Sequence, residues 1–147
     1  VQLQGPAVQV LDHGATLYFP HGRRLRWAHE IIAIRSREAA ESLGELTLPS
    51  EARAVSVYTL KADGRRLPAE DSAEKESVSL PDLAAGDYVV AQYLEPGDNG
   101  YLYDSGFLTP RVFLQTSELP VFQQRFEAFG WDGQSPVAQR LAGAETR

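Results

Sequence analysis

The sequence contains neither cysteine nor methionine among its 147 residues. Without cysteine, the chain has no disulfide bond, no thiolate metal site and no cysteine nucleophile, whereas any redox compartment suits it. Because methionine is absent, Val1 is not a natural start, so we expect the chain to be a processed or excised part of something longer.

Long apolar runs and an excess of basic residues are missing as well. No run approaches the ~20 residues that cross a bilayer, and no basic region leads into a short apolar one, so we expect no membrane insertion by this chain. The chain has 14 Lys and Arg against 20 Asp and Glu. Its net charge of −6 opposes the counterion release that drives nucleic-acid binding, so a nucleic-acid partner is not expected.

Turn signals divide the chain into runs rich in β-branched and aromatic residues. Four pairs supply the positive φ that tight hairpins require, namely His13-Gly14, His21-Gly22, Asp63-Gly64 and Asn99-Gly100. The first two pairs separate residues 7–11, 15–19 and 23–36. These three runs predict a three-strand meander.

The run 23–36 follows a two-residue period, which is typical of a strand. One face would carry Leu25, Trp27, His29, Ile31 and Ala33. The other would carry Arg24, Arg26, Ala28, Glu30, Ile32 and Ile34, and it turns apolar towards its end. The second face therefore changes from polar to apolar along one strand.

Residues 29–33, which start with His29-Glu30, match the HExxH zinc signature at four of its five positions. The second histidine is replaced by Ala33, which cannot bind metal, and a strand gives the wrong spacing for ligands on one helical face. We expect His29 to pack beside Trp27 on a partly buried face. His13 and His21 are expected in hairpin turns at opposite ends of the sheet, so the sequence predicts no metal site.

One short helix is predicted near residues 37–43, because Ser36 can cap it and Gly44 can supply a left-handed C-terminal residue. Further strands are expected at residues 53–61, 86–96, 106–116 and 120–129, and residues 65–70 should pair with the first of these after Asp63-Gly64.

About eight or nine strands predict an all-β fold, a multistranded antiparallel β-sandwich with one short helix. It should occupy residues 1–130. Residues 131–147 read as a linker or C-terminal tail, with a turn or two of helix at 136–142.

Signatures of catalysis and of phosphate binding are missing. GxSxG, the Walker loop and GxGxxG do not occur, and Ser105-Gly106 lacks a strand-to-helix elbow. The sequence therefore predicts no catalytic residue and no cofactor, and we expect this chain not to be an enzyme.

The segment 95–107 concentrates acidic and aromatic residues around Asn99-Gly100. The spacing of its oxygen-bearing side chains does not follow the ligand order of a calcium-binding EF-hand loop. If Tyr101 and Tyr103 share an exposed strand face near Asp98 and Asp104, these four residues form an interaction surface for a neighbouring domain, another protein, a peptide or a glycan. In the alternative interpretation, both tyrosines belong to the core.

Three segments resemble a bacterial domain of unknown function that lies N-terminal to transglutaminase-like (papain-fold) domains. They are RWAHEIIAIRSREAAESLGEL, YTLKADGRRL and SVSLPDLAAGDYVVAQYLEPG. The resemblance covers roughly residues 8 to 129. It implies a non-catalytic all-β accessory domain beside a cysteine-dependent hydrolase or acyltransferase, usually in exported or periplasmic proteins.

The sequence after Phe129 shows no recognisable start of such an enzyme domain. The enzyme domain either lies beyond Arg147 or is lacking. Two alternatives stay open: a stand-alone glycan- or peptide-binding β-sandwich module, and a part of a hydrolase whose nucleophile lies in another domain.

Overall fold

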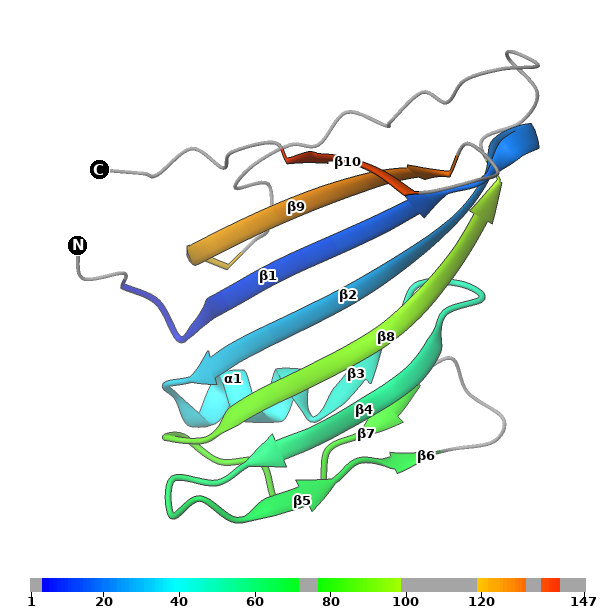
Figure 1. Cartoon of the computed structure of the whole chain (residues 1–147). Helices are drawn as coiled ribbons and strands as arrows, with labels where there is room; N and C mark the ends of the chain where they lie inside the picture. Colours follow the sequence, from blue (N-terminus) through cyan, green and yellow to red (C-terminus); the bar gives the residue numbers. More distant parts are fainter. Residues whose placement is uncertain (1–3, 72–76, 99–118, 132–135, 141–147) are drawn as a thin grey trace.

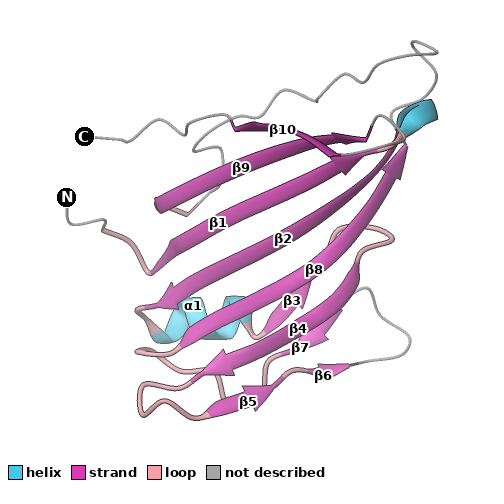
Figure 2. Cartoon of the chain, in the orientation of Figure 1, coloured by secondary structure: helices cyan, strands magenta, loops and turns pink. Residues whose placement is uncertain are grey.

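The computed structural model describes residues 4–71, 77–98, 119–131 and 136–140. Strands dominate them (Figure 2), which confirms the all-β fold with one short α-helix. In chain order the elements are β1 (Ala7–Tyr18), the 3-10 turn η1 (Pro20–Gly22), β2 (Arg23–Ile34), α1 (Arg37–Leu43), β3 (Glu45–Thr47), β4 (Arg53–Leu60), β5 (Arg66–Pro68), β6 (Glu70–Asp71), β7 (Ser77–Ser79), β8 (Tyr88–Asp98), β9 (Val121–Trp131) and β10 (Pro136–Arg140).

The described strands form two sheets (Figure 1). The large sheet has seven strands in the order β10-β9-β1-β2-β8-β4-β5, and the small sheet has three in the order β3-β7-β6. Helix α1 and the small sheet lie against one side of the large sheet, near the start of β8 and the end of β2. We call this side the inner face and the opposite side the outer face.

One strand pairing differs from the expected antiparallel pattern. β1 and β9 run parallel, from Gln9 beside Val121 to Tyr18 beside Gly130, whereas the other described pairings are antiparallel. A parallel pair needs a long connection, and these two strands come from opposite ends of the described chain. The large sheet is therefore mixed.

The expected meander at the N-terminus is wrong in one respect. His13 and Gly14 lie inside the single strand β1, and Gly14 pairs with Ala28 of β2. A Cβ on Gly14 would lie 3.1 Å from Nε of Arg26, so glycine at this position allows a side chain to cross the strand. The turn between β1 and β2 lies at His21 and Gly22, whose φ values are 66° and 77°.

The helix is confirmed at Arg37–Leu43, with the Ser36 hydroxyl accepting a hydrogen bond of 3.1 Å from the N–H of Ala39. The expected left-handed residue is not found, because Gly44 has φ −63°. Its carbonyl accepts a 2.8 Å bond from Leu80, and the chain continues into β3. No helix in the described part of the chain is long and apolar enough to cross a membrane.

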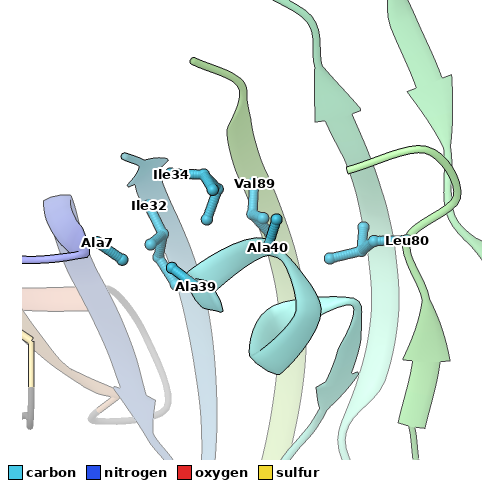
Figure 3. Close-up of a cluster of buried hydrophobic side chains, with 7 residues drawn as sticks. All are labelled: Ala7, Ile32, Ile34, Ala39, Ala40, Leu80 and Val89. Carbon is cyan, nitrogen blue, oxygen red and sulfur yellow. The ribbon is translucent and has the colours of Figure 1, made fainter. Parts of the chain in front are cut away.

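The core lies between α1, the small sheet and the inner face of the large sheet (Figure 3). Its buried members are Ala7, Ile32, Ile34, Ala39, Ala40, Leu80 and Val89. The apolar end of this face of β2 lies in the core, where Ile32 and Ile34 point towards α1. A second cluster joins Ala28, Leu48 and Tyr93 farther along the same face.

The predicted strands at 53–61, 86–96 and 120–129 correspond to β4, β8 and β9, and the Asp63-Gly64 turn leads into β5 as expected. Residues 136–140, where a helical turn was expected in a linker, form strand β10 and pair antiparallel with β9. The strand expected at 106–116 and the turn at Asn99-Gly100 lie outside the described residues.

Candidate functional site

The inner face of the large sheet carries a polar cavity beyond the part that α1 and the small sheet cover. On β2 the inner residues are apolar at Ile32 and Ile34 and charged at Arg24 and Arg26, as the two-residue period predicts. The cavity has a volume of about 280 Å³. It is lined by Asp12, Gly14, Thr16 and Tyr18 of β1, Arg24 and Arg26 of β2, Glu95 of β8, and Gln124, Arg125 and Phe126 of β9.

A single carboxylate joins the two arginines of β2. Glu95 accepts hydrogen bonds from Nη2 of Arg24 at 3.3 Å and from Nη1 of Arg26 at 3.0 Å, one on each oxygen. All three side chains are about three-quarters or more buried. Charge-assisted bonds in a site partly screened from water are stronger than neutral ones, so Glu95 holds both guanidinium groups in place.

Glycines make room for these arginines. Arg26 lies over Gly14 of β1, and Arg24 lies over Gly97 of β8, where a Cβ would come within 2.5 Å of Nε. Each glycine stands on a strand next to β2. The two arginine side chains therefore lie across the neighbouring strands. A larger residue at either glycine position would obstruct this arrangement.

A second pair of polar groups lies on β1 and β9. Nε2 of Gln124 donates a 2.7 Å hydrogen bond to Oδ2 of Asp12. The two residues stand opposite each other in the parallel register. Near one end, the cavity thus presents the carboxylate of Asp12 and the amide of Gln124. Farther along the strands it presents the two arginines of β2 and the carboxylate of Glu95.

Glu30 and Tyr93 lie deeper on the same face. The Tyr93 hydroxyl donates a 2.6 Å hydrogen bond to Oε1 of Glu30. Burial raises the pKa of Glu30 above its ordinary value, an effect that this bond and the charge of Arg26 partly oppose. Burial, with the charge of Glu30, also raises the pKa of Tyr93. At neutral pH Tyr93 is therefore a donor.

The outer face carries an aromatic cluster. The rings of His13 and Trp27 meet edge to face at 5.2 Å between centroids, and Trp27 and His29 lie 5.7 Å apart. The predicted packing of His29 beside Trp27 is confirmed. His13 is not in a turn as expected, because it pairs with His29 in mid-strand, and its Nε2 lies 3.1 Å from Oε2 of Glu127.

The histidines do not form a metal site with their neighbours in the described ranges, which contain no group of three or more His, Asp or Glu side chains placed to hold an ion. Glu127 instead bonds to Arg125 and to His13. Its pKa is lowered by hydrogen bonds from Arg125 and His13. The cluster is an ordinary cross-strand packing arrangement.

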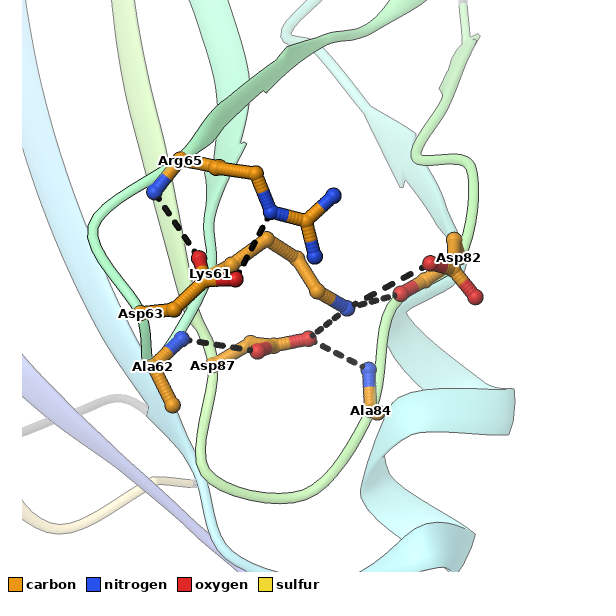
Figure 4. Close-up of polar contacts among 7 residues, drawn as sticks. All are labelled: Lys61, Ala62, Asp63, Arg65, Asp82, Ala84 and Asp87. Carbon is orange, nitrogen blue, oxygen red and sulfur yellow. Dashed lines mark hydrogen bonds and ion pairs between the residues drawn. The ribbon is translucent and has the colours of Figure 1, made fainter.

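A further polar cluster links the β4–β5 turn to the loop before β8 by hydrogen bonds (Figure 4). The buried carboxylate of Asp87 accepts hydrogen bonds from Nζ of Lys61 at 2.7 Å, from the N–H of Ala84 at 2.8 Å and from the N–H of Ala62 at 3.3 Å. These three donors satisfy Asp87 within the protein, so the cluster has a structural role.

The predicted interaction surface is described at one of its four residues. Asp98 is the last residue of β8 and is exposed, opposite Arg23 of β2. Tyr101, Tyr103 and Asp104 lie outside the described residues. Sequence reasoning did not identify the inner-face cavity, although the charged half of β2 and the glycine inside β1 were signals of it.

Comparison with known proteins identifies the fold. No family model matches the sequence, and no curated protein matches it. A putative protease from Parabacteroides distasonis has a similar structure, with a TM-score of 0.63 and 15% identity over 88% of this chain. An M1 zinc metallopeptidase from Deinococcus radiodurans matches with a TM-score of 0.44 and 14% identity over 87% of this chain. This chain spans 30% of the first protein and 33% of the second. The similarity to the first protein shows that this chain has the fold of one part of that longer protein.

Proposed function

We propose that this chain is a non-catalytic accessory domain of a longer hydrolase, of the transglutaminase-like or cysteine-protease-like kind. The observation that carries the proposal is the structural similarity to part of a longer protein described as a protease. The resemblance of three sequence segments to a domain that precedes transglutaminase-like enzymes supports it. The nucleophile would then belong to another domain, because this chain has no cysteine.

The partner in this proposal is a neighbouring domain of the same polypeptide, and its contact surface comprises Asp98, Tyr101, Tyr103 and Asp104. Asp98 is exposed at the end of a long strand, where a neighbouring domain can reach it. Interfaces between domains of one chain commonly bury 600–1,500 Å² by the general estimate, and aromatic residues anchor them. The two tyrosines would supply those anchors.

The first test is the complete polypeptide that the gene encodes. We expect a second domain with a cysteine, a histidine and an aspartate in that order. The purified polypeptide should hydrolyse a peptide or transfer an acyl group, and a thiol-alkylating reagent should stop the reaction, whereas residues 1–147 alone should be inactive. Catalysis by residues 1–147 alone, or a polypeptide without a further domain, would contradict the proposal.

The second test concerns the contact surface. We expect the Tyr101→Ser, Tyr103→Ser double variant to lower the stability of the two-domain protein and to leave residues 1–147 alone unchanged. Tyr88→Ser is the matched control, because Tyr88 is exposed on β8 away from Asp98. A double variant with the stability of the parent two-domain protein would exclude this surface.

The inner-face cavity supports a second candidate, a glycan- or peptide-binding module. A cavity with convergent donors, acceptors and aromatic rings is the usual setting of a small-molecule site. This function is compatible with an accessory role, because the cavity is lined by residues of this chain.

A further inference from the structure

The charged side chains of the inner-face cavity are balanced. Arg24 and Arg26 face Asp12 and Glu95 within it, while the guanidinium of Arg125 is paired with Glu127. An anion entering the cavity would be attracted by the arginines and repelled by the carboxylates, and a cation would meet the reverse. Electrostatics therefore do not favour a simple ion of either sign.

A hydroxyl group suits such a lining better than an ion does. Each hydroxyl donates one hydrogen bond and accepts others, so it can accept from an arginine and donate to a carboxylate at once. The donors and acceptors are already held in position, by the fork of Glu95 between two arginines and by the Gln124–Asp12 bond. Preorganised groups lose little entropy when a ligand binds.

Arg24 has hydrogen-bonding capacity to spare. A guanidinium has five N–H donors, and within the described residues Arg24 makes one side-chain hydrogen bond, the 3.3 Å contact to Glu95. Its Nε is buried against Gly97 and is not open to a ligand. An oxygen-rich ligand would therefore supply acceptors to the terminal Nη groups of this cavity-lining side chain.

The cavity also has the size and the apolar surface that a ring-shaped ligand needs. Its volume of about 280 Å³ is near the lower end of the range for small-molecule sites, roughly 300–1,000 Å³. The aromatic rings of Tyr18 and Phe126 line it together with the polar groups. Aromatic rings offer flat apolar surfaces on which the C–H face of a ring can rest.

We propose that the inner-face cavity binds a neutral, polyhydroxylated ligand of the size of a single sugar ring. Arg24 and Arg26 donate to its hydroxyl oxygens, Asp12 and Glu95 accept from its hydroxyl protons, and Phe126 contacts its apolar face. This inference rests on the second candidate function, ligand binding in the inner-face cavity. It does not depend on the proposed accessory function, because each of these groups belongs to this chain.

The test is a titration of the protein with glucose, galactose, mannose and N-acetylglucosamine, one at a time, followed by NMR of the backbone amides and arginine Nε–H groups. We expect at least one of the sugars to shift the signals of Arg24, Arg26 and Gln124, with a Kd on the order of 1 mM. Phosphate and citrate are the competing probes. If neither sugar nor anion shifts these signals, or if the anions alone do so, the proposal is wrong.

Two variants assign the binding to the cavity. Arg24→Met keeps an unbranched apolar stem and removes the guanidinium donors, so we expect it to weaken sugar binding about tenfold. Arg23→Met is the matched control, because Arg23 is the neighbouring residue of β2, exposed on the other side of the strand. Thr16→Val, which keeps the shape of a cavity-lining side chain, should also weaken binding. Equal effects of Arg24→Met and Arg23→Met would overturn the assignment.

Discussion

His13 and His29 face each other directly across β1 and β2, and the ring of Trp27 lies against both. The pKa of His29 is lowered from its ordinary value of 6.5, chiefly by burial and to a smaller degree by the neighbouring His13. Gln92 stands opposite on β8, and Glu127 bonds to His13. In the described part of the chain, no acidic side chain contacts His29 directly. The free-energy cost of protonating His29 is therefore not offset by an ion pair.

We therefore expect His29 to make folding sensitive to acid. A lowered pKa means that the unfolded chain binds more protons below pH 6.5, so the stability that neutral His29 contributes is present above 6.5 and is lost as the pH falls towards its folded pKa. The free energy of unfolding, measured in urea from about pH 8 to about pH 5, should fall more steeply for the parent protein than for His29→Gln. Parallel curves would contradict this.

His29→Ala should lower stability and leave the metal content unchanged. The side chain packs against Trp27 within a strand, and position 33 on the same face is an alanine. Loss of this packing should cost on the order of 1 kcal/mol, as for most substitutions of partly buried residues. Elemental analysis of the purified protein provides the check, and stoichiometric zinc that disappears in the variant would overturn the exclusion of a zinc site.

Tyr93→Phe should destabilise the protein by about 1–3 kcal/mol at neutral pH, because Glu30 then loses the hydroxyl that donates to it at 2.6 Å. The pKa of Glu30 is already raised above 4.5 by burial, so its favourable contribution is complete below 4.5 and is lost as the pH rises through its folded pKa. The variant should therefore approach the parent in stability at low pH. Tyr88→Phe, at an exposed tyrosine on the same strand, is the control and should have little effect.

Asp87 and Asp82 both lie near Nζ of Lys61, at 2.7 and 3.7 Å, but their surroundings differ. The Asp87 side chain is 4% exposed and also accepts from two backbone N–H groups, whereas that of Asp82 is 79% exposed. Asp87→Ala leaves buried donors without partners and should cost about 3 kcal/mol. Asp82→Ala should change stability by less than about 0.5 kcal/mol. Thermal or urea unfolding of both variants measures the contrast, and equal losses would show that Asp87 has no special role.

Several elements could be predicted because their signals are local. The alternation along β2 assigns Trp27 and His29 to one face and Arg26 and Ile34 to the other, as found, since the strand period operates within one segment. Ser36 caps α1 for the same reason. Gly14 was misread as a turn residue, because glycine also marks the place where a side chain from the next strand crosses close to the backbone.

The candidate site was less accessible to such reasoning. Its charged residues on β2 were assigned correctly to one face, but their function depends on partners far away in the sequence. Glu95 is 69 residues from Arg26, and Gln124 is 112 residues from Asp12. Nothing within either segment indicates that the carboxylate, the amide and the arginines share one cavity.

The sequence by itself determined the all-β class, the short helix and the two faces of β2, because backbone propensity and hydrophobic period act over a few residues. The tertiary structure decided that β9 joins β1 in parallel, that residues 136–140 extend the sheet as β10, and that four strands contribute the cavity lining. Strand neighbours are chosen by the packing of whole faces and by the entropy of closing long connections. Neither quantity is encoded within a single segment.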